Sequence, residues 1–234
     1  MHWHQNFHQV HNADISSSSV FSSFWGAFSG ALFAFLFGIA TYVIAKRRER
    51  FIQHKNAIIK LERMLNRHLD ELAILEKIIG DTSAILKLGK LTSNRLFGFK
   101  MPEGLDLELY SLDLVNRLFS YQSHINRLDF DVLSLNHSLT LFENILIGGG
   151  TLNAQNLDFA NRMLGGLSKE MPLLENEIKD FLAITRLYLI KTKENESFVR
   201  SVFRKNWNFE FTSTEILKEK MELNKEIEQT SQKK

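Results

Sequence analysis

Histidine is the residue type whose spacing comes nearest to a site for chemistry. Four of the eight histidines lie within the first 11 residues, at His2, His4, His8 and His11. If this tail were helical, His4, His8 and His11 would share one face, and imidazoles gathered in this way bind zinc, copper or nickel. A polar tail without Lys or Arg is also typical of a segment that is translocated to the outer side of a membrane. We therefore interpret the tail as a translocated segment, with His4, His8 and His11 as alternative metal ligands, and expect no cofactor.

No other group of residues matches a catalytic pattern. The run Gly148-Gly149-Gly150 lacks the Gly-Lys-Ser/Thr ending of a phosphate-binding loop. Asp129 and Asp131 are two positions apart, so on a helix they point to different sides and form no carboxylate pair. The lack of cysteine excludes disulfides, thiolate metal sites and cysteine nucleophiles. We therefore expect a protein that is not an enzyme, and leave open a site completed by another chain.

The distribution of charge predicts a membrane anchor. The formal net charge of the 234 residues is only +2, yet residues 20–45 contain no Asp, Glu, Lys, Arg or His. A helix of this length covers roughly 39 Å, which exceeds the ~30 Å hydrocarbon core of a bilayer. Trp25 and Tyr42 stand near its two ends, where interfacial aromatic anchors are found. We therefore predict a transmembrane helix over residues 20–45.

Basic residues flank this helix on one side only. Lys46, Arg47, Arg48 and Arg50 follow it, whereas the first 19 residues contain neither Lys nor Arg. Because basic flanks stay in the cytoplasm, we expect an inner (plasma) membrane protein with its N-terminus outside and its C-terminal domain cytoplasmic. A cleaved signal peptide carries its charge before a shorter apolar stretch, so the segment is interpreted as a retained signal anchor. The same four basic residues are expected to contact anionic lipids.

Small residues recur every four positions along the predicted transmembrane helix. This small-residue ridge consists of Ser22, Gly26, Gly30, Ala34 and Gly38. Small side chains at this spacing let two helix backbones approach closely in lipid, which predicts a homo-oligomer. The absence of ionisable groups gives no support for a proton relay or an ion-coordinating role.

Long helices with heptad-spaced apolar residues are predicted for the rest of the chain. After a tail over 1–19 and the transmembrane helix over 20–45, we expect a basic juxtamembrane helix over 46–91, with an interruption near Gly80-Asp81. A loop or short strand over 92–106 and an antiparallel helical hairpin over 107–195 should follow. The chain should end in a strand-like segment with a last helix over 196–234. The heptad positions are Ile58, Leu61, Leu65, His68, Leu72, Leu75 and Ile79, then the series from Leu114 to Leu146, then the series from Leu157 to Phe181.

Local signals refine this outline. The heptad register survives across Gly165-Gly166 and Pro172, which favours one kinked helix over two helices. Thr212 and Glu215 are spaced as a capping box at the start of the last helix. Two segments with alternating apolar residues would pair as a small two-stranded ribbon; they contain Phe97, Phe99 and Met101, and Trp207, Phe209 and Phe211.

The sequence thus predicts an all-α membrane protein with one N-terminal transmembrane helix and a cytoplasmic bundle of long helices. The favoured function is a single-pass membrane-anchored scaffold or signalling/sensor protein that self-associates and recruits a protein partner. The alternative is a membrane-disrupting effector or pore-forming subunit controlled by its cytoplasmic helical domain. Expected partners are membrane lipids, further copies of the chain and an unidentified protein. No nucleic-acid-binding module is visible.

Overall fold

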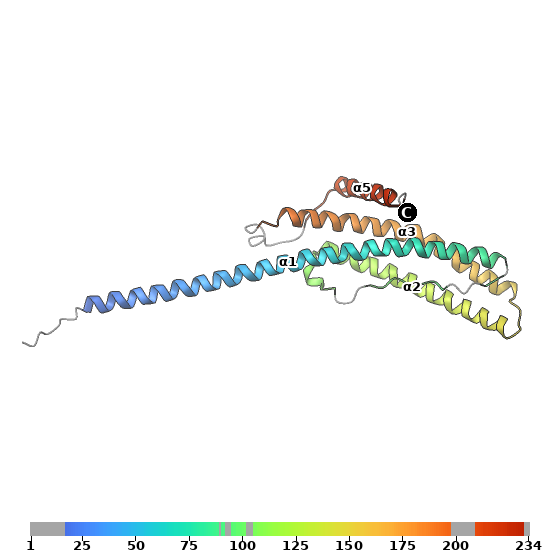
Figure 1. Ribbon diagram of the computed structural model, residues 1–234, viewed down its shortest axis with the longest axis horizontal. Coiled ribbons are helices and arrows are strands. Elements are labelled where there is room, and N and C mark those ends of the chain that lie inside the picture. The colour runs from blue at the N-terminus through green and yellow to red at the C-terminus, as the bar shows by residue number, and fades with distance from the viewer. Residues whose placement is uncertain (1–16, 89, 92–94, 102–104, 198–208, 232–234) are drawn as a thin grey trace, which may run out of the picture. The chain divides into compact units, whose positions relative to one another are not determined.

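The structure is a computed structural model that describes residues 17–88, 90–91, 95–101, 105–197 and 209–231. Over these residues the chain is helical and contains no strand. It forms four α-helices, α1 (Ser17–Lys87), α2 (Leu112–Ile147), α3 (Ala154–Glu194) and α5 (Ser213–Ser231), and one 3-10 turn at Leu107–Leu109 (Figure 1). The predicted all-helical class is confirmed. The chain divides into two compact units, one ending at Arg47 and one beginning at Arg48.

The described part of the first unit is the amino-terminal portion of α1. Its side chains from Phe21 onward are almost all exposed, and Phe33 and Phe37 are each 72% accessible. Within the described residues, α1 is the one helix that is long and apolar enough to cross a membrane. The length and composition of the predicted span are therefore present in a single continuous helix.

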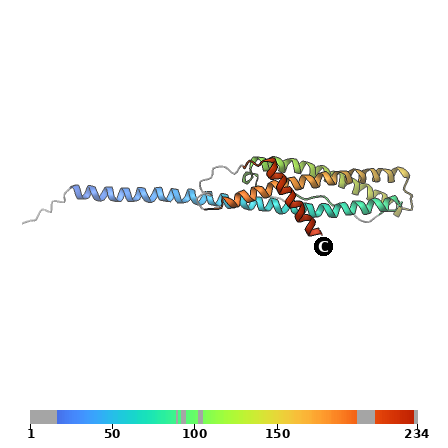
Figure 2. The same cartoon turned by 90° about the horizontal axis from the view of Figure 1, so that it is seen from above.

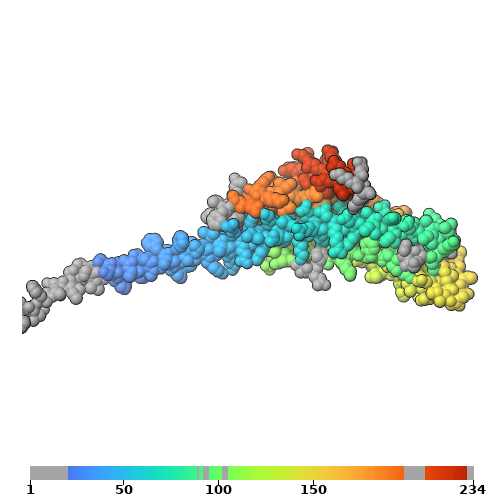
Figure 3. Space-filling model, in the orientation of Figure 1, coloured from blue at the N-terminus to red at the C-terminus, as the bar shows by residue number. Residues whose placement is uncertain are grey.

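The core of the second unit is built from the heptad positions of three helices. Those of α1 from Ile58 to Ile79 are at most 4% exposed, and they pack in one cluster with their counterparts on α2 and α3. α2 and α3 run antiparallel side by side, and α5 lies on α3 (Figures 1 and 2). Figure 3 shows α5, in red, covering part of the orange α3. Leu146, the last position of the second series, is 41% exposed because it lies beyond the core.

Glycine and proline act differently in the two helices of the hairpin. α2 ends where Gly149 takes a positive φ of 78°, and the Gly148 N–H donates to the carbonyl of Asn144. α3, by contrast, continues through Gly165, Gly166 and Pro172. The prediction of one helix across these residues is confirmed, because the buried face of α3 is kept on both sides of the proline.

α1 does not stop near Gly80-Asp81, as the sequence predicted, but runs on to Lys87. The reason is that Ile79, Thr82 and Leu86 extend the buried series with spacings of three and four. Burying Leu86 contributes roughly 1.5–3 kcal/mol, which exceeds the ~1 kcal/mol cost of a glycine inside a helix.

The predicted two-stranded ribbon is wrong for the residues that the structure describes. Residues 97–101 and 209–211 contain no strand, and Trp207 lies outside the described residues. Phe209 and Phe211 instead pack edge-on against the ring of Tyr188, with centroids 5.5 and 5.0 Å away. Each extended segment is therefore bound by a helix rather than by the other segment.

The capping box at the start of α5 is confirmed. The hydroxyl of Thr212 accepts from the Glu215 N–H at 3.3 Å, and the Glu215 carboxylate accepts from the Thr212 N–H at 2.8 Å. These bonds satisfy two backbone donors at the helix start. The bonds that the Glu215 carboxylate accepts from the N–H and the hydroxyl of Thr212 lower its pKa.

Candidate functional site

The small-residue ridge lies on the exposed surface of α1. Ser22, Gly26, Gly30, Ala34 and Gly38 are all exposed in this chain. A Cβ atom added to Gly26, Gly30 or Gly38 would meet no other atom within 4 Å. Contacts within the chain therefore do not account for small residues at these positions, and self-association through them stays a prediction.

Polar side chains within the apolar part of α1 bond to the helix itself. The hydroxyl of Ser29 donates to the carbonyl of Trp25 at 2.7 Å, and that of Thr41 donates to the carbonyl of Phe37 at 2.9 Å. A hydroxyl bonded to its own backbone needs no water, so both residues are compatible with an apolar environment.

The basic run follows directly on the same helix. Lys46, Arg47, Arg48 and Arg50 are exposed, and the Lys46 ammonium lies 5.9 Å from the centroid of the Tyr42 ring. An ammonium over an aromatic face is weakly stabilised and still available to anions. Contact of these four residues with anionic lipids stays a prediction.

A set of enclosed polar contacts in the second unit surrounds His68, which is 1% exposed. Its Nε2 lies 3.2 Å from the carbonyl oxygen of Lys100, and its Nδ1 lies 2.6 Å from the hydroxyl of Tyr121. A carbonyl can only accept, so Nε2 carries the hydrogen and Nδ1 accepts from the tyrosine. Burial lowers the pKa of His68, which favours the neutral ring that this arrangement requires. His68 thus joins α1, α2 and the segment before α2.

That segment, residues 95–101, is extended but tightly held by α2. The side-chain amide of Asn136 accepts from the Leu96 N–H at 3.0 Å and donates to the Leu96 carbonyl at 2.7 Å. The Asp129 carboxylate accepts from the Phe99 N–H at 2.9 Å. Burial raises the pKa of Asp129, and the bond from Phe99 opposes this rise.

Gly98 lies in close contact with a side chain of α2. A Cβ there would collide with the carboxylate of Asp129. The backbone and the carboxylate can approach closely only because residue 98 has no side chain. Asp129 therefore holds the backbone of this segment, and Asp131 has no part in that contact.

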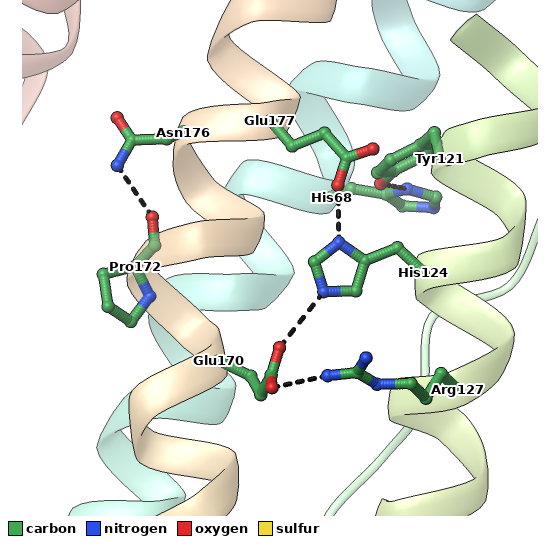
Figure 4. Close-up of polar contacts among 8 residues, drawn as sticks. All are labelled: His68, Tyr121, His124, Arg127, Glu170, Pro172, Asn176 and Glu177. Atoms are coloured by element: carbon green, nitrogen blue, oxygen red, sulfur yellow. Dashed lines mark hydrogen bonds and ion pairs between the residues drawn. The ribbon is translucent and has the colours of Figure 1, made fainter.

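A second histidine joins α2 to α3 (Figure 4). The Nδ1 of His124 lies 2.5 Å from the Glu177 carboxylate, and its Nε2 lies 3.4 Å from that of Glu170. Glu170 also accepts from Arg127 at 2.5 Å. The two carboxylates lie at opposite ring nitrogens and do not converge on one point, so the arrangement is suited to bridging the helices. No local sequence pattern indicates this contact, because His124 and Glu177 are 53 positions apart.

No group of three His, Asp or Glu side chains among the described residues is arranged to hold a metal ion. The predicted alternative ligands His4, His8 and His11 lie outside the described residues. Comparison of the chain with known protein families, curated proteins and solved structures finds no match.

Proposed function

We propose that this protein is a single-pass membrane-anchored helical scaffold or signalling protein that self-associates and recruits a protein partner. One observation carries the proposal: from Phe21 to Tyr42, α1 exposes large apolar side chains and no charge, and no residue that the structure describes buries them. Leaving each such side chain in water costs roughly 1.5–3 kcal/mol. A bilayer removes that cost for all of them together.

The orientation can be tested because the natural chain has no cysteine. Ser18→Cys places a thiol before the apolar segment, and Ser168→Cys places one on the exposed surface of α3. With a membrane-impermeant maleimide, the first variant should be labelled in intact cells and the second only after permeabilisation. Equal labelling of both variants in intact cells, or labelling in the reverse order, would refute the proposed topology.

Self-association is tested at Gly26 and Gly30. The double variant Gly26→Leu, Gly30→Leu should lose oligomers in a mild detergent, because the bulky side chains separate the backbones of two helices. Ala27→Leu with Ala31→Leu is the matched control, since it adds similar bulk one position along. A Cβ at either glycine would meet no atom within 4 Å beyond the neighbouring backbone of α1, so a direct effect on the fold is not expected. Oligomers that survive the first variant, or dissociate equally in both, contradict a role for the ridge.

A surface on α2 supports the recruitment of a partner. Five large apolar side chains with helical spacing are between 48% and 69% exposed: Leu112, Phe119, Phe130, Leu133 and Leu141. Exposed apolar faces of this kind are common at protein interfaces. Cross-linking in cells followed by mass spectrometry should recover proteins that are lost from Phe119→Asn, Phe130→Asn and retained by Leu173→Asn, a control on α3. Equal recovery from both variants would exclude the α2 face as the recruiting surface.

A further inference from the structure

A pocket of about 330 Å³ lies between α1 and the 95–101 segment, within the second unit. Among the residues that the structure describes, its lining contains four cationic side chains, the neutral His68 and no acidic residue: Lys60, Arg63, Met64, Arg67, His68, Lys100 and Met101. We refer to it as the basic pocket. Nothing in the anchoring or self-association of the chain calls for this concentration of positive charge.

The α1 side of the basic pocket is a stripe of cations. Lys60, Arg63 and Arg67 are spaced by three and four residues, so they project from one exposed face and repel each other. Arg67 is partly neutralised by Glu71, whose carboxylate lies 2.7 Å from its Nε. Arg63 forms no ion pair with any residue that the structure describes. An anion in the pocket would relieve this repulsion.

The opposite side of the basic pocket comes from a distant part of the chain and is fixed in place. Lys100 is held because its own carbonyl accepts from buried His68 and the neighbouring Phe99 N–H donates to Asp129. Phe99 is 2% exposed and its ring packs edge-on to that of His68, at 5.4 Å. The position of Lys100 opposite the α1 stripe is therefore set by the core and does not depend on a ligand.

We propose that the basic pocket binds an organic phosphate that carries two or more phosphate groups. Guanidinium groups pair with phosphate oxygens in a bidentate manner, and lysine adds a point charge. Met64 and Met101 form an apolar part of the wall, which suits the organic portion of such a ligand. A volume of about 330 Å³ lies within the usual range for small-molecule pockets.

Two sources of this chemistry are distinguishable. A soluble polyphosphate such as a nucleotide can reach the pocket from water, whereas a phosphoinositide headgroup must come from a bilayer. Lys60 lies 12 residues beyond Arg48 on α1, a rise of roughly 18 Å, which is longer than the ~8 Å screening length at physiological salt. We therefore expect the soluble source.

The test uses the full chain reconstituted into nanodiscs of neutral phosphatidylcholine. Binding of ATP, pyrophosphate and inorganic phosphate is measured by calorimetry. ATP and pyrophosphate should bind saturably and more tightly than inorganic phosphate. Arg63→Gln and Lys100→Gln should each weaken ATP binding about tenfold, since each removes a charge-assisted contact. Lys77→Gln is the matched control, because it removes the same charge from an exposed position of α1 outside the pocket.

A second variant distinguishes specific binding of ATP in the basic pocket from nonspecific electrostatic attraction of ATP to the basic surface. Asn136→Ala leaves every charge in place but removes both bonds to Leu96, so Lys100 loses part of its support and ATP binding should weaken. Discs that contain phosphatidylinositol bisphosphate should leave the ATP affinity unchanged; competition would instead show that a lipid headgroup supplies the phosphates. The proposal is overturned if no probe binds saturably, or if Lys77→Gln weakens binding as much as Arg63→Gln.

Discussion

The buried contact between Tyr121 and His68 offers a sharp test of the packing of the second unit. Tyr121→Phe removes one oxygen atom and keeps the ring, which packs 6.0 Å from Phe181 and 5.9 Å from the His68 ring. Both Tyr121 and His68 are at most 1% exposed. The substitution therefore leaves Nδ1 of His68 as an acceptor without a donor, in a place that water does not reach.

The expected cost follows from that lost donor. An unsatisfied buried polar group costs about 1–3 kcal/mol, whereas deletion of an exposed hydroxyl costs little. With a urea dependence of about 1–3 kcal/mol per molar, the unfolding midpoint should fall by roughly 1 M. Thr140→Val is the control, because it removes an exposed hydroxyl that bonds to its own helix on the same α2.

Urea unfolding of the detergent-solubilised full chain, followed by far-UV circular dichroism, measures this cost. His68→Leu combined with Tyr121→Phe should recover part of the loss, since neither side chain then lacks a partner. A midpoint for Tyr121→Phe within 0.2 M of the unmodified chain (roughly 0.4 kcal/mol) would refute the reasoning. It would mean that Nδ1 has another donor and that His68 does not depend on α2.

Three further predictions concern the same unit. Burial lowers the folded-state pKa of His54 and His68 below 6.5, so below this pH the unfolded chain binds more protons than the folded chain. The free energy of unfolding should therefore be constant above pH 6.5 as far as these two groups are concerned, and should decrease as the pH falls below it. Urea unfolding at several pH values should show a decrease of up to about 1.4 kcal/mol per pH unit for each histidine. Gly98→Ala should cost about 1–3 kcal/mol in the same assay, because its Cβ displaces the half-buried Asp129 carboxylate that accepts from the Phe99 N–H. Leu223→Ala should cost roughly 2–5 kcal/mol of α5 docking, seen as faster amide exchange in α5 while α2 stays protected.

The helices were predictable because their burial follows a repeating pattern. Ile58, Leu61 and Leu65 recur at spacings of three and four, which place them on one face of a helix. That face is the one that is buried in the core. The continuous α3 was predictable for the same reason, since a register that survives Pro172 is explained by one helix. The end of α1 was mispredicted because glycine was given more weight than two further buried positions. Local propensity is small beside burial.

The candidate sites were harder to predict because their contacts join residues far apart in the sequence. His124 meets Glu177 across 53 positions, and Lys100 meets His68 across 32. Neither pair repeats, so no periodicity marks it. His68 was visible as a polar residue within an apolar series, yet its two partners were not. The basic pocket was missed because Lys100 lies in a segment without a helical pattern.

The spacing of polar residues on α2 corresponds to the position of the 95–101 segment, which was predicted as part of a ribbon. Phe97, Phe99 and Met101 alternate as in a strand, and the backbone is indeed extended, but its hydrogen-bonding partner is a helix. Leu96 and Phe99 are three residues apart, about 10 Å in an extended chain, and their partners Asn136 and Asp129 are seven apart, about 10.5 Å on a helix. The distance between Leu96 and Phe99 along the segment therefore matches the distance between Asn136 and Asp129 along α2.

These contacts also show in which direction the 95–101 segment runs along α2. The lower-numbered residue of the segment meets the higher-numbered residue of α2, so the segment runs antiparallel to the helix. Arg95, one residue before Leu96, reaches seven residues further along α2 through its long side chain, since its guanidinium lies 2.5 Å from the carboxylate of Glu143. Asp129, Asn136 and Glu143 thus form a polar heptad beside the apolar one. In this chain the apolar heptad of α2 packs into the helical core, and its polar heptad binds the 95–101 segment.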